Sequence, residues 1–149
     1  MNKFMAEAIK EARKAAAAGE IPVGAVVVCD GKIISRAHNK REASQIATKH
    51  AEIIAIEKAC KKLKSWRLDD CEIYVSLEPC PMCTGAIANA RISKLYFAAE
   101  EKTSQDGLLE KIISSARLNH KAEYSFTPCE EASKILTDFF KNKRKKTEI

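Results

Sequence analysis

Hydrophobic positions recur along this chain with two different periods, which separate predicted helices from predicted strands. Apolar residues three and four positions apart are typical of an amphipathic helix, whereas short β-branched runs are typical of a strand. The helical period predicts helices over residues 2–18, 50–63, 79–90 and 129–143, with a short one beyond Gly107. The β-branched runs predict strands over residues 23–29, 32–34, 71–77 and 92–99, and a weaker one over 122–126. Residues 38–48 are polar and aperiodic, so we predict a loop there.

The order of these elements indicates how they form a sheet. The pair Asp30-Gly31 lies between two apolar runs, which favours a tight antiparallel hairpin. From residue 71 to 99 the order strand, helix, strand is that of a βαβ unit, whose two strands are parallel. The sequence therefore predicts one α/β domain over residues 1–149, with helices packed on a mixed sheet and a basic tail over about residues 141–149.

Composition limits the class of protein. The chain of 149 residues is 46% hydrophobic and 31% charged, which is typical of a globular domain rather than a disordered or coiled-coil chain. The longest apolar stretch, residues 21–29, is too short to cross a bilayer. Residues 1–4 lead into a charged segment without the apolar core of a signal peptide, so we expect a cytoplasmic protein with no membrane partner.

Basic charge is concentrated at the C-terminal end. The net charge is +6, and residues 141–149 carry five basic residues against one acidic residue, which accounts for +4 of it. An arm of this kind is typical of proteins that contact nucleic-acid phosphates, although solubilising tails have the same composition.

Two short motifs contain potential metal ligands, His50-Ala51-Glu52 and Pro79-Cys80-Pro81-Met82-Cys83. Both fall at predicted helix N-termini, where free N–H groups and the positive end of the helix dipole stabilise a thiolate. Cys80 and Cys83 share one helical face, and His50 supplies a third ligand from the neighbouring helix. One nitrogen and two sulfur ligands suit tetrahedral Zn²⁺, so we predict a zinc site formed by these three residues.

Three protein ligands leave one coordination position open, which distinguishes a catalytic zinc from a structural one. Water at that position has a pKa lowered toward neutrality. Glu52 lies two residues from His50 and can approach this water without binding the metal, as a general base does. We therefore predict that Glu52 is catalytic.

Two alternatives to a catalytic zinc remain open at this point. A structural zinc site needs a fourth ligand, and Cys71 is a candidate, but a strand separates it from Cys80 by roughly 20 Å or more. A redox pair formed by Cys80 and Cys83 leaves His50 and Glu52 without a role. The two other histidines, His38 and His120, lack metal-binding neighbours in sequence, which favours structural roles.

With these motifs, the chain resembles the cytidine deaminase superfamily and, within it, the bacterial tRNA-specific adenosine deaminases. The combination of His-x-Glu with Pro-Cys-x-x-Cys is the signature of zinc nucleobase deaminases. The likeness covers nearly the whole chain, to about Arg144. Besides the metal motif it is carried by residues 19–26, by Asn39, and by residues 66–68, 74–80, 119–120 and 138–144.

The resemblance implies a cytidine deaminase-like α/β fold, with a mixed five-stranded sheet between helices. It also implies a homodimer with one Zn²⁺ per subunit and an active site that receives residues from both chains. The implied reaction is hydrolytic deamination of adenosine to inosine at the wobble position, the first anticodon position, of tRNA. In that reaction the target base is unstacked, and water replaces the amino group at C6.

The resemblance further assigns residues to substrate contacts. Asn39 is implied to hydrogen-bond the base, and Val23 and Ala51 to line the base pocket. The residues implied to bind the tRNA anticodon stem-loop are Phe140, Lys141 and Arg144.

The chain departs from the family pattern in two places. Lys49 stands immediately before His50, where the family has a small alanine, and it places a cation beside the predicted site. Residues 99–108 also differ from the family's loop and include two additional acidic residues.

Two other functions compete with tRNA deamination. A free-base guanine deaminase shares residues 68–71, 78–83 and 96–100, whereas Val23, Arg67 and the basic ending argue against it. A zinc-stabilised RNA-binding module without catalysis requires a closed, four-ligand metal site, and the presence of Glu52 argues against that.

Overall fold

The computed structural model describes residues 1–101 and 107–147. The helices are α1 (Lys3–Ala17), α2 (Arg41–Ser44), α3 (Ala51–Leu63), α4 (Pro81–Asn89), α5 (Leu108–Ile113) and α6 (Glu130–Thr147). The strands are β1 (Gly24–Cys29), β2 (Lys32–His38), β3 (Cys71–Val75), β4 (Lys94–Phe97) and β5 (Glu123–Phe126). Among these residues, no helix has both the length and the apolarity needed to span a membrane.

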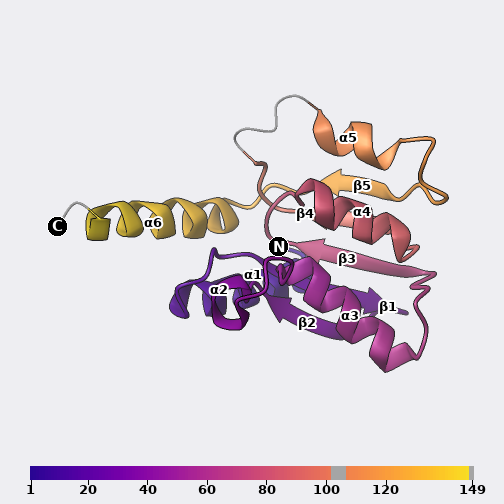
Figure 1. Cartoon of the computed structure of the whole chain (residues 1–149), viewed down its shortest axis with the longest axis horizontal. Helices are drawn as coiled ribbons and strands as arrows, with labels where there is room; N and C mark the ends of the chain where they lie inside the picture. Colours follow the sequence, from indigo (N-terminus) through magenta and orange to yellow (C-terminus); the bar gives the residue numbers. More distant parts are fainter. Residues whose placement is uncertain (102–106, 148–149) are drawn as a thin grey trace.

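The strands form one mixed sheet in the order β2-β1-β3-β4-β5 (Figure 1). β1 pairs antiparallel with both β2 and β3, whereas β3, β4 and β5 run parallel to one another. The predicted hairpin and the predicted βαβ unit are both confirmed, since β1 and β2 are antiparallel neighbours and α4 connects parallel β3 and β4. The mixed five-stranded sheet expected from the resemblance is therefore confirmed.

Helices cover both faces of this sheet because its central strands are apolar on both sides. Along β1, Ala25 and Val27 belong to one core cluster with residues of α3, α4 and α5. Val26 and Val28 alternate with them and belong to a second cluster with residues of α1 and α6. The sheet thus lies between two helical layers, and the N-termini of α3 and α4 lie close together at one end of it (Figure 1).

Two glycines meet specific backbone requirements. Asp30 and Gly31 have φ values of 52° and 74°, which a two-residue hairpin turn between Cys29 and Lys32 requires. Gly24 has a different role, because a Cβ there would lie 2.0 Å from the carbonyl oxygen of Ala8. The missing side chain lets α1 pack directly on the start of β1.

The structure corrects the predicted element bounds at several points. β2 continues to His38, and the segment predicted as a loop contains the short helix α2. β3 ends two residues earlier than predicted and β4 begins two residues later. α6 continues through Thr147, so the described part of the basic tail is helical. The divergent segment 99–108 is described only in part, since residues 102–106, like residues 148–149, lie outside the described residues.

Candidate metal centre and active-site cavity

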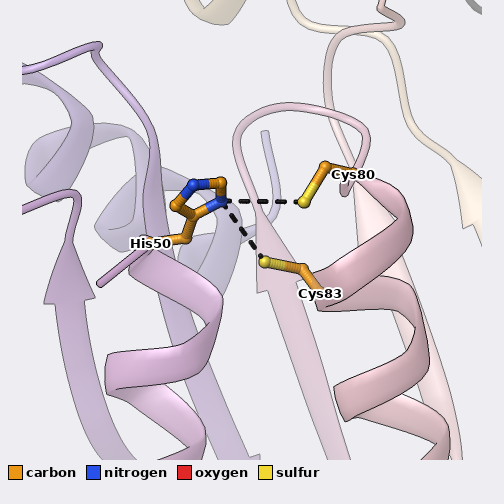
Figure 2. Close-up of side chains that lie close together, drawn as sticks. All are labelled: His50, Cys80 and Cys83. Carbon is orange, nitrogen blue, oxygen red and sulfur yellow. Dashed lines mark hydrogen bonds between the residues drawn. The ribbon is translucent and has the colours of Figure 1, made fainter. Parts of the chain in front are cut away.

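His50, Cys80 and Cys83 converge where two helices begin. His50 is the N-cap residue of α3, and Cys80 is the N-cap residue of α4. Pro81 starts α4, where a missing N–H leaves no hydrogen bond unmade, and Cys83 follows within the first turn. Figure 2 shows both sulfur atoms facing the same nitrogen of the His50 ring.

The distances fit a tetrahedral metal ion. His50 Nδ1 lies 3.6 Å from Cys80 Sγ and 3.6 Å from Cys83 Sγ. Zinc bonds of about 2.3 Å to sulfur and about 2.0–2.1 Å to nitrogen, at a tetrahedral angle, place those ligand atoms about 3.6 Å apart. Within residues 1–101 and 107–147 no fourth cysteine, histidine or carboxylate joins the group. The arrangement fits zinc with one open position.

The surroundings shift the pKa values of the two thiols in opposite directions. A hydrogen bond from the Cys83 thiol, aided by the nearby His50 ring, lowers the pKa of Cys80 to about 5. The same hydrogen bond, together with burial, raises the pKa of Cys83. The surroundings therefore favour the thiolate form of Cys80 over that of Cys83.

Glu52 is buried beside this group on the first turn of α3. Its Oε1 atom has no hydrogen-bond partner, which is costly for a buried carboxyl oxygen. Burial is the main reason that its pKa rises to about 7. A carboxyl group with these properties can exchange a proton with a molecule placed next to it.

A cavity of about 690 Å³ opens beside the three ligands and reaches α6. Its size falls in the range of small-molecule sites. It is lined by every predicted metal, catalytic and base-contacting residue except Cys83. The lining residues among them are Val23, Asn39, His50, Ala51, Glu52 and Cys80, whereas Cys83 is fully buried.

Asn39 is held in the cavity wall by three hydrogen bonds. Its backbone N–H donates to the carbonyl of Val23 at 3.1 Å, and its Nδ2 donates to the carbonyl of Ile21 at 3.4 Å. Its Oδ1 accepts from the backbone N–H of Arg41 at 3.1 Å. The segment before β1 and the segment after β2 are thereby joined into one wall.

One face of α6 forms a further wall of the cavity, and the sequence motifs indicated only part of it. Of the three residues predicted to bind RNA, Phe140 and Arg144 line the cavity, whereas Lys141 is exposed on α6 and does not line it. The same helical face also contributes Ser133, Leu136 and Thr137. Their spacing of three and four residues is a signal that the sequence contains. Arg41, which no motif indicated, is a further lining residue, and so is Glu78, which lies in a recognised motif but has no predicted role.

Three polar side chains that the sequence left as candidates have partners outside the cavity lining. Lys49 forms an ion pair with Glu57 at 2.9 Å and does not line the cavity. His38 Nδ1 lies 3.0 Å from Glu11, and His120 bonds to a backbone carbonyl, so both histidines are structural as predicted. Burial alone would raise the pKa of Glu11, but its hydrogen bonds from Lys14 and His38 outweigh burial and lower it.

Cys71 lies at the far end of β3, outside the ligand group. Burial and the neighbouring Cys29 raise the pKa of its thiol to about 12. The alternative of a four-ligand site completed by Cys71 therefore lacks support.

Comparison with known proteins assigns this centre to a family. A family model described as MafB19-like deaminase matches residues 1–144. The tRNA-specific adenosine deaminase of Bacillus subtilis (strain 168) is 48% identical over 145 residues, covering 96% of this chain and 90% of that protein. This chain belongs to the tRNA-specific adenosine deaminase family. Members of this family are deaminases, so the chain is an enzyme of the hydrolytic deaminase class.

Solved structures agree with the family assignment. A structure from studies of A-to-I editing by tRNA:A34 deaminases at the wobble position has a TM-score of 0.84 and 37% sequence identity. It covers 89% of this chain and 98% of its own chain, which confirms the cytidine deaminase-like fold. A guanine deaminase from Bacillus subtilis has a TM-score of 0.65 and 35% identity, with 95% coverage of both chains. The fold is thus shared, and the family assignment favours the tRNA-specific adenosine deaminases.

Proposed function

We propose that this chain deaminates adenosine to inosine at the wobble position of tRNA. The observation that carries the proposal is the convergence of His50, Cys80 and Cys83 beside the buried carboxyl group of Glu52, in a chain of this family. We propose that the three ligands hold one Zn²⁺ per subunit. When bound, Zn²⁺ supplies Lewis acidity that favours deprotonation of water.

Glu52 is the proposed proton carrier of the reaction. It takes a proton from the attacking water, whose oxygen bonds to C6 of adenine, and delivers that proton to N1. It then takes the remaining proton from the C6 hydroxyl group and transfers it to the amino group, so that the C6–N bond breaks, ammonia leaves and the C6 carbonyl of inosine forms. The raised pKa of Glu52 suits both steps, since a carboxyl group with a pKa of about 7 gains and loses protons near neutral pH.

The remaining cavity residues are proposed to bind the substrate. Asn39 hydrogen-bonds the edge of the unstacked adenine, and Val23 and Ala51 form apolar walls around it. An exposed aromatic ring and two cations on α6 are proposed to hold the anticodon stem-loop, through stacking and phosphate contacts. These residues are Phe140, Lys141 and Arg144.

The domain organisation, the oligomeric state and the location in the cell are also proposals. We propose a single domain over residues 1–149, whose basic C-terminal part meets RNA phosphates. The resemblance to the family supports a homodimer, which analytical ultracentrifugation tests through the mass of the particle. The proposed substrate supports a location in the cytoplasm, which fractionation of cells tests directly.

The decisive experiment incubates the purified, zinc-loaded chain with total tRNA and maps inosine by sequencing. We expect inosine at the first anticodon position, with zinc measured at one per chain. The matched variant Glu52→Gln is isosteric and is expected to keep zinc while losing inosine formation. Inosine formed by this variant at the wild-type rate would remove Glu52 from the mechanism.

The same preparation distinguishes the alternative of a guanine deaminase, which a solved relative of this fold represents. We expect no ammonia release from free guanine. Ammonia from guanine without any inosine in tRNA would replace the proposed function. Zinc held by four protein ligands, seen in an X-ray absorption spectrum, would favour the non-catalytic RNA-binding module instead.

A further inference from the structure

Glu20 is a buried carboxylate outside the cavity lining, and no motif gave it a role. It is 1% exposed, in the turn between α1 and β1. Its two oxygens accept hydrogen bonds from the backbone N–H groups of Glu42 and Ala43, at 2.9 Å and 2.7 Å. A side chain twenty-two residues away thus caps the first turn of α2.

The cap is needed because α2 cannot supply its own. Lys40 occupies the N-cap position, and its side chain makes no capping hydrogen bond. The second and third N–H groups of a helix have no partner within the helix, and a side-chain oxygen normally satisfies one of them. Glu20 satisfies both, and buried carboxylate bonds of this kind are stronger than neutral ones.

The capped segment carries one wall of the cavity. Asn39 and Arg41 line the cavity on either side of Lys40, directly before the amides that Glu20 holds. Asn39 also bonds to the carbonyls of Ile21 and Val23, immediately after Glu20. The segments 20–23 and 39–43 are therefore joined by two sets of hydrogen bonds, one at Asn39 and the other at Glu20.

We infer that Glu20 is a positioning residue for substrate recognition, which acts by holding Asn39 and Arg41 in the cavity wall. This inference rests on the proposed function for its substrate. If the wall is ordered in only a fraction of molecules, the apparent affinity for substrate falls by that fraction, because binding must first order the wall. Once substrate is bound, the wall is in place and the chemical step is unaffected.

The test compares Glu20→Gln with Glu11→Gln. Gln at position 20 keeps one acceptor but directs an amide N–H at a backbone N–H, so one charge-assisted bond is lost. That loss corresponds to roughly a ten-fold or larger change in population. Because KM scales inversely with the ordered fraction, we expect KM for tRNA to rise by up to about ten-fold, the full change applying where the wall of the variant is mostly disordered, and kcat to stay within about two-fold. Glu11 is a buried carboxylate outside the cavity lining, and Glu11→Gln is expected to leave KM unchanged.

A purely structural role for Glu20 has a different kinetic signature. Partial unfolding lowers the amount of active enzyme, so the apparent kcat falls while KM stays constant. That result would overturn the inference, as would an unchanged KM with unchanged kcat. If Glu20→Gln does not fold, Glu20→Asp replaces it, since it keeps the charge but withdraws it by one methylene and is also expected to raise KM.

Amide hydrogen exchange provides a readout that does not depend on the reaction. Glu20→Gln is expected to speed exchange in residues 40–45 at least ten-fold and Glu11→Gln to leave that segment unchanged. Equal exchange in wild type and Glu20→Gln overturns the inference. If the wild type forms no inosine, the proposed function fails, and the exchange data still decide whether Glu20 orders this wall.

Discussion

The packing of α1 on β1 makes the substitution Gly24→Ala a sharp test of this architecture. The new Cβ would lie 2.0 Å from the carbonyl oxygen of Ala8 and 2.5 Å from the backbone nitrogen of Ala12. Both are backbone atoms of α1, so the whole helix must move by on the order of 1 Å. Overpacking of this kind costs about 3 kcal/mol. In a domain of this size that corresponds to a fall in Tm of about 6–12 °C.

Thermal unfolding followed by circular dichroism measures this effect, with Gly85→Ala as the matched control. A Cβ at Gly85 meets no atom within 4 Å, and Gly85 lies inside α4. Alanine is the better helix former by up to about 1 kcal/mol, so the control is expected to raise Tm by a few degrees. Equal Tm changes for the two variants, or a stable Gly24→Ala protein, would show that α1 does not pack as described.

Three further predictions concern the metal, the solution pH and the ionic strength. Cys83→Ala is expected to lose zinc to below about a tenth of an equivalent by atomic absorption, and full retention would exclude Cys83 as a ligand. Because the pKa of Glu11 is lowered, its ionised form stabilises the fold above pH 4.5. Urea unfolding should give Glu11→Gln a lower free energy of unfolding than the wild type at pH 7. This difference should vanish as the pH falls through the lowered pKa of Glu11, and a difference that stays constant with pH contradicts the prediction. Arg144→Ala should raise KM for tRNA and reduce the salt slope of binding by about one, and an unchanged slope would exclude a phosphate contact.

The metal centre could be predicted from the sequence because its ligands depend on local rules. Cys80 and Cys83 lie on one face of a helix by spacing alone, and Pro81 marks where that helix begins. Only the position of His50 next to the two cysteines depends on tertiary structure, because it lies on a different helix. The βαβ unit around α4 indicated which strands are parallel, and that placed the start of α4 beyond the carboxyl end of β3.

The cavity walls were harder to predict because they depend on contacts distant in sequence. The segment that contains α2 has no hydrophobic period. Its short helix is capped by Glu20, which precedes β1 in the sequence, whereas α2 follows β2. Lys49 shows the same limit. Because it immediately precedes the metal ligand His50 in the sequence, a cation was predicted beside the site. Its actual partner, Glu57, lies eight residues further on, along α3.

The length of α6 gives its attachment point a large influence on the far end of the cavity. Ala132 is packed in the core beside α1, where Arg13 and Glu131 form an ion pair, and the C-terminal half of α6 projects beyond the sheet (Figure 1). Twelve residues of helix separate Ala132 from Arg144, about 18 Å, so a tilt of about 5° at the base swings Arg144 by roughly 1.5 Å. A small change in the packing of Ala132 therefore produces a larger displacement of Arg144. If Arg144 contacts RNA as proposed, a change in the volume of the Ala132 side chain would shift that contact while the metal ligands stay in place.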